Sequence, residues 1–145
     1  MSLAPLVIGI ATFAANYLLL SALFTAFPGL VAHTFPAKPW WAGLNPLLLN
    51  LYVGIAAPVF EEAIFRAVIL ERLRRFGDGA ALIASSMAFG AYHLLFGWGW
   101  FKAVDMALVG IVFGIVYLRY RLSGSIACHI ANNAASILAT LFSSG

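Results

Sequence analysis

Residues Leu47–Leu70 read LLLNLYVGIAAPVFEEAIFRAVIL, an apolar run that is interrupted by Glu61, Glu62 and Arg66. A helix of about 20 apolar residues is long enough to cross the hydrocarbon core of a bilayer. Placing one carboxylate at its centre costs roughly 2.5–3.5 kcal/mol on insertion scales. A helix that only anchors a protein would not carry two of them, so this stretch predicts a functional site inside the membrane.

The composition is that of a membrane protein. Of the 145 residues, 63% are hydrophobic and 9% are charged, whereas a soluble domain is typically about 45–50% apolar and about 25% charged. The net charge of +3 comes from cations near predicted helix ends, without a basic tail or patch, so nucleic-acid binding is not expected. The single cysteine, Cys128, excludes an intrachain disulfide and a multi-cysteine zinc site, and it is expected to be a packing residue.

Five apolar stretches predict an all-α, polytopic transmembrane helix bundle that forms one domain, residues 1–145. The stretches are Ala4–Phe27, Pro46–Leu73, Gly79–Phe96, Phe101–Leu118 and Gly124–Phe142. The first is too long for a signal-peptide core and lacks a basic residue before it, so it is expected to be a retained span. Pro58 lies one turn before Glu61, where it either frees a backbone carbonyl beside a cavity or simply kinks the helix.

Charged and aromatic residues predict the orientation of this bundle. The loops after the second and fourth stretches are basic, and the positive-inside rule places them, together with the N-terminus, in the cytoplasm. The basic residues are Arg72, Arg74, Arg75, Arg119 and Arg121, and the aromatic residues of the opposite loops are Trp40, Trp41, Trp98, Trp100 and Phe101. Lys38 is the cation of the first of these opposite loops. Lys102 and Asp105 are expected to form a snorkelling ion pair at the outer helix end. The chain is therefore predicted to be a multi-pass protein of the cell membrane, embedded in the lipid bilayer.

The spacing of the polar residues in the second stretch predicts which of them share a helix face. Glu62 and Arg66 are four residues apart, share a helix face and are expected to pair. Glu61 lies about 100° away on the helix, so its carboxylate is expected to face a cavity, where apolar surroundings would make it a stronger general base. The alternative is that all three side chains form a buried structural network.

Two later stretches repeat the four-residue spacing. Phe89 can pack beside His93, although a lone histidine in an apolar helix is usually a core residue. His129 and Asn133 present N–H donors on one face, which suits an oxyanion hole. Asn132 is about 100° away and is expected to pack between helices.

These motifs, in this order and each on its own predicted membrane helix, resemble those of the CPBP family. This family comprises the intramembrane CAAX-type proteases, which are related to the type II CAAX prenyl endopeptidases and the bacterial Abi proteins. The motifs are Glu61-Glu62-xxx-Arg66, Phe89-xxx-His93 and His129-xxx-Asn133. The resemblance covers about residues 58–133, the catalytic core of the family.

The resemblance implies an endopeptidase that acts on a membrane-associated protein or peptide. Glu61 with His93 would activate a water molecule, His129 and Asn133 would stabilise the oxyanion, and Glu62 with Arg66 would support the site. One carboxylate and two histidines could bind Zn²⁺. However, no H-E-x-x-H motif occurs and Asn133 is a poor zinc ligand, which favours a glutamate mechanism without a cofactor.

Two other functions fit part of the pattern. A non-enzymatic immunity or scaffold protein of the membrane could use the same fold. A proton or ion pathway would also use intramembrane Glu and His residues. It would require polar residues across the whole bilayer, whereas here they are predicted to gather in one half.

Overall fold

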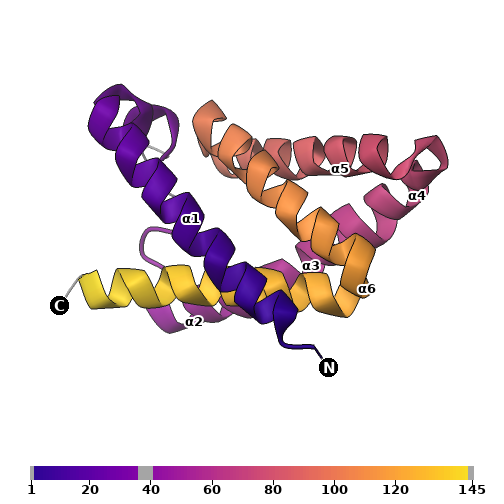
Figure 1. Ribbon diagram of the computed structural model, residues 1–145. Helices are drawn as coiled ribbons and strands as arrows, with labels where there is room; N and C mark the ends of the chain where they lie inside the picture. The colour runs from indigo at the N-terminus through magenta and orange to yellow at the C-terminus, as the bar shows by residue number, and fades with distance from the viewer. Residues whose placement is uncertain (1, 36–40, 144–145) are drawn as a thin grey trace.

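The computed structural model describes residues 2–35 and 41–143, and every regular element in these residues is a helix. Helix α1 (Ala4–Ala26) has Pro5 in its first turn and is followed by the short 3-10 helix η1 (Pro28–His33). Figure 1 shows α1 lying diagonally across the other helices. The prediction of an all-α membrane bundle is confirmed.

The second predicted span is a run of six short elements with right-handed helical dihedrals at their junctions. They are α2 (Pro46–Leu51), η2 (Tyr52–Ala56), α3 (Ala57–Glu62), η3 (Ala63–Leu70), α4 (Glu71–Leu73) and η4 (Arg74–Phe76). The Asn45 side chain caps the start by accepting from the N–H groups of Leu47 and Leu48. Elements η2 and η3 are π-helical. Short π-helical stretches are frequent at functional sites.

The remaining predicted spans form two elements and a 3-10 turn. Helix α5 (Asp78–Tyr92) continues into η5 (His93–Phe96) and ends at Gly97, which has a φ of 80°. Helix α6 (Trp100–Ser143) has 44 residues and breaks at Arg121, where φ is 59° and ψ is −166°. Figure 1 shows the sharp turn between its two halves. The halves correspond to the fourth and fifth predicted spans, but a single residue replaces the expected loop.

Glycines allow the helices to approach α6 closely. Gly9 of α1 lies against the main-chain carbonyl of Cys128, and Gly90 of α5 lies against that of Ala103, so a Cβ at either position would collide with backbone. Gly114 faces the Leu82 side chain. Gly114 of α6 is therefore used for packing within the bundle.

Within residues 2–35 and 41–143, three helices are long and apolar enough to cross a membrane, namely Ala4–Ala26, Asp78–Phe96 and Trp100–Ser143. Large apolar side chains such as Leu18 and Phe60 are exposed on the outside of the bundle, which suits contact with lipid. That the chain crosses the membrane five times stays a prediction.

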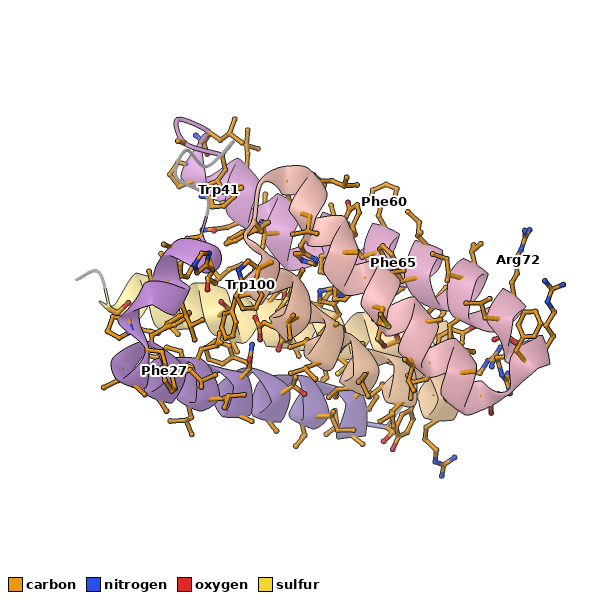
Figure 2. All side chains as sticks on the ribbon, turned by 90° about the horizontal axis from the view of Figure 1, so that it is seen from above. Phe27, Trp41, Phe60, Phe65, Arg72 and Trp100 are labelled. Atoms are coloured by element: carbon orange, nitrogen blue, oxygen red, sulfur yellow. The ribbon has the colours of Figure 1, made fainter. Side chains whose placement is uncertain are left out.

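The basic and aromatic residues lie at opposite ends of the bundle, as Figure 2 shows for Arg72 at one end and Trp41 and Trp100 at the other. This separation agrees with the charge and aromatic pattern, while the cytoplasmic placement of the basic end stays a prediction. Lys38 and Trp40 lie outside the described residues.

Candidate active site

Glu62 lies at the centre of a buried polar network. Its carboxylate accepts a hydrogen bond from Arg66 Nε at 3.2 Å, and both side chains have an exposed fraction of 0%. The Ser125 hydroxyl donates to Glu62 Oε2, and His129 Nδ1 lies 3.0 Å from Glu62 Oε1. The predicted Glu62–Arg66 pair is present, and it is joined to α6 through two side chains.

Arg66 connects the same network to α5. Its Nη1 donates to the Ser85 hydroxyl at 2.9 Å, and Ser85 donates to the Phe65 carbonyl at 2.6 Å. The guanidinium also lies over the Phe89 ring, 5.1 Å from its centroid. A buried ion pair is retained at lower cost when its polar atoms are bonded in this way, and among the described residues Arg66 Nη2 is the one guanidinium nitrogen that is buried without a hydrogen-bond partner.

The His129 ring is held on several sides. It stacks on Phe113, with 4.3 Å between ring centroids and 28° between planes. Because the Glu62 carboxylate is paired with Arg66 and accepts hydrogen bonds, we assign the proton of the bonded ring nitrogen to His129 Nδ1. The other nitrogen, Nε2, lies 3.6 Å from Glu61 Oε2.

His93 is the first residue of η5, at the end of α5. Its Nδ1 lies 2.9 Å from the Phe89 carbonyl, and a carbonyl can only accept, so Nδ1 carries the proton. The neutral ring therefore has Nε2 as a hydrogen-bond acceptor. The Phe89 ring meets the imidazole edge-on at 5.0 Å, as their spacing predicts.

Asn133 is fixed by two hydrogen bonds. Its Nδ2 donates to the Val53 carbonyl in η2 at 2.9 Å, and its Oδ1 accepts from Asn132 Nδ2 at 3.1 Å. The expectation that Asn132 packs between helices is wrong, because its side chain lies in a cavity and orients its neighbour. The prediction assumed that residues about 100° apart on a helix face different surroundings. It was wrong here because two consecutive residues can both border a wide cavity.

A cavity of about 420 Å³ brings four of the predicted site residues together: Glu61, His93, His129 and Asn133. Glu62 and Arg66 do not line it. The second span thus has one glutamate directed to the cavity and one held in the buried network.

Lys102 and Asp105 differ from the prediction. They pair at 3.0 Å, but Lys102 lines the cavity and Asp105 has an exposed fraction of only 5%. The pair therefore faces the interior of the bundle instead of snorkelling at its surface.

Comparison with models of known families matches residues 43–135 to the family described as type II CAAX prenyl endopeptidase Rce1-like. The chain belongs to this family. Searches of curated proteins and of solved structures each found no match. Membership supports a CAAX-type membrane protease, which is a hydrolase, and implies a membrane-associated substrate and a lipid bilayer.

Four residues that hold the site of this Rce1-like chain were not selected by sequence interpretation: Ser85, Phe113, Ser125 and Asn132. Two of them carry a recognisable signal. Ser85 lies four residues before Phe89, and Ser125 lies four residues before His129. Extending each motif by one helical turn toward the N-terminus would have found both.

The described part of this Rce1-like chain contains no group of three or more His, Cys, Asp or Glu side chains placed to hold a metal ion. Glu61 Oε2 and His129 Nε2 are 3.6 Å apart, and His93, which lines the same cavity, is bonded to Phe89 through Nδ1 and keeps Nε2 unbonded to it. A mechanism without a cofactor stays a prediction.

Proposed function

We propose that this chain is an intramembrane endopeptidase that hydrolyses a peptide bond of a membrane-associated protein or peptide. One observation carries the proposal. Glu61 borders the same cavity as His93, His129 and Asn133, whereas Glu62 is taken up by Arg66. Two adjacent carboxylates in different surroundings suit different roles.

In the proposed mechanism Glu61 is the general base. Its side chain has an exposed fraction of 14% and opens into the cavity. A water molecule that donates to Glu61 and to His93 Nε2 loses a proton to Glu61 as its oxygen attacks the scissile carbonyl carbon. When the C–N bond breaks, Glu61 returns this proton to the leaving amine.

The oxyanion requires donors that are fixed before the reaction. A side-chain amide has two N–H groups, and Asn133 uses one for the Val53 carbonyl, so the second is proposed to donate to the substrate oxygen. His129 is proposed as the second oxyanion group through Nε2, and Glu62 holds the ring in place through Nδ1. Arg66 acts only through Glu62, as a positioning residue.

The test is a mass-spectrometric survey of new protein termini in membranes from cells that express the native chain or Glu61→Gln. Such a survey detects cleavage of any membrane protein, so no substrate has to be chosen beforehand. We expect termini that are present with the native chain and absent with Glu61→Gln. Glu71→Gln is the matched control, because Glu71 lies outside the cavity and is expected to give the native profile.

Equal profiles for the native chain and Glu61→Gln, with both proteins stably inserted, would contradict proteolysis. That outcome would favour the non-enzymatic immunity or scaffold function.

A further inference from the structure

The two walls of the cavity differ in chemistry. The lining residues from α2 and the second half of α6 include polar side chains and form one wall, whereas those from residues 96–113 are aromatic and apolar apart from Lys102 and form the other wall. The polar side chains are Asn50, Asn132, Ser136 and Thr140, which we call the polar groove. The opposite wall includes Phe96, Trp98, Met106 and Val109.

The polar groove continues beyond the main cavity. Asn50, Ser136 and Thr140 also border an adjoining cavity of about 120 Å³ between α2 and the last turns of α6. Near the catalytic end, the hydrogen bond from Asn133 to Val53 ties α6 to η2, the element that follows α2 directly. The groove therefore leads from the candidate catalytic residues toward the C-terminal end of α6.

The position of these polar residues is not explained by helix packing. Ser136 and Thr140 are exposed at the groove, although they lie in a predicted membrane span. Polar side chains in such spans usually face the bundle interior or a functional path. The Ser136 hydroxyl can both donate and accept, whereas the Thr140 hydroxyl donates to the Ser136 carbonyl and offers its oxygen as an acceptor, so these side chains suit contact with the main-chain groups of a ligand.

The spacing of the groove matches an extended polypeptide. Asn132, Ser136 and Thr140 recur every four residues, which is about 6 Å along a helix. Two residues of an extended chain rise about 6.6–6.8 Å, and main-chain N–H and C=O groups on one edge recur at that interval. The three side chains can thus face roughly four residues of an extended segment.

An unwound segment in the membrane also needs such partners, because unbonded backbone groups are costly where water is scarce. We propose that the polar groove binds an extended segment of the substrate through its main chain, next to the scissile bond, with substrate side chains directed to the aromatic wall. This proposal rests on the proposed endopeptidase function and adds how the substrate is held.

The test uses a pool of internally quenched peptides with the purified full chain in liposomes. A peptide that the native chain cleaves is then measured with Ser136→Ala and Thr140→Val. We expect KM to rise by about two- to tenfold for each variant, the effect of one net hydrogen bond, with kcat little changed.

Helix α1 offers matched controls. Thr25 and Thr140 both donate to the carbonyl four residues before them and both are exposed, but Thr25 lies outside both cavities. Ser21 is likewise exposed on α1. Thr25→Val and Ser21→Ala are expected to keep the native KM.

A second measurement separates binding from cleavage. Glu61→Gln is titrated with the fluorescently labelled peptide and with analogues N-methylated at successive amides. We expect N-methylation to lower the affinity of the peptide for Glu61→Gln at alternate amides only. This reduction in affinity should be smaller for the double variant Glu61→Gln/Ser136→Ala.

The outcomes separate the two proposals. Cleavage with native KM in both groove variants, or a methylation effect without alternation, would overturn the groove and leave the endopeptidase standing. Binding that depends on Ser136 without any cleavage by the native chain would keep the groove and overturn the endopeptidase.

Discussion

The Asn133 amide donates to the Val53 carbonyl at 2.9 Å, across 80 positions of the sequence. Pro58 explains why this carbonyl needs a side-chain partner. The Ala57 N–H bonds to Tyr52 in the π-helical register, and the next residue, Pro58, has no N–H to offer Val53. The predicted freeing of a carbonyl near Glu61 is therefore observed, and Asn133 is positioned in the cavity by it.

Asn133→Ala is expected to lower kcat by roughly 10²–10³-fold, the usual loss when one oxyanion donor is removed. The variant also leaves the Val53 carbonyl without its partner. Asn132→Ala should cause a smaller loss of kcat, because it releases the orientation of Asn133 without removing the oxyanion donor, and its groove contact is expected to act on KM. Single-turnover cleavage of one defined peptide measures both, and equal losses would contradict this division.

Glu62→Gln is expected to destabilise the protein by about 3–5 kcal/mol, because it leaves the Arg66 charge buried without its counterion. Thermal unfolding in detergent, compared with Glu61→Gln, measures the difference. Glu61→Gln should unfold near the native temperature, since Glu61 is not part of the buried pair.

The double variant Glu62→Gln/Arg66→Met is the control for that explanation. Removing both charges should restore much of the lost stability. If the double variant is less stable than Glu62→Gln, the uncompensated charge is not the cause.

The backbone at Arg121 predicts an unusual effect of glycine. A positive φ in a residue with a Cβ costs of order 1–3 kcal/mol. Arg121→Gly and Arg121→Ala both remove the guanidinium contacts with Glu71 and Tyr117, but only glycine relieves the strain. Arg121→Gly should therefore be roughly 1 kcal/mol more stable than Arg121→Ala by thermal unfolding. The reverse order would show that the strain is absent in solution.

Chelator treatment tests the proposed glutamate mechanism. Cleavage of the defined peptide is expected to be unchanged after dialysis against a strong zinc chelator, because no step of the mechanism uses a metal. Activity that is lost on dialysis and regained only on adding Zn²⁺ would overturn the mechanism while leaving the groove and the fold as described.

The sequence predicted the features that depend on local helical spacing. The Glu62–Arg66 pair and the Phe89–His93 contact follow from four-residue spacing, and the apolar stretches located the helices. The inward position of Lys102 and the cavity position of Asn132 were missed. Both depend on which side of a helix meets its neighbours, and that is set by contacts between distant segments.

A break between the fourth and fifth spans was predicted, but the π-helical stretches and the reduction of this break to the single residue Arg121 were missed for a related reason. Apolar composition does not distinguish an α-helix from a π-helix. Residues 119–123 contain no proline, and an arginine gives no signal for a positive φ.

The break at Arg121 has a consequence for how the length of this chain can vary. Both cavity walls include residues of α6, with Trp98 and Met106 near or in one half and Asn132 and Ser136 in the other. Since one residue joins the halves, an inserted residue that extended either helix would turn its wall by about 100° relative to the other. Connecting loops usually absorb insertions and deletions. The junction at Arg121 cannot absorb them. The rotation of the two cavity walls relative to each other is therefore fixed at a residue that lies outside the cavity.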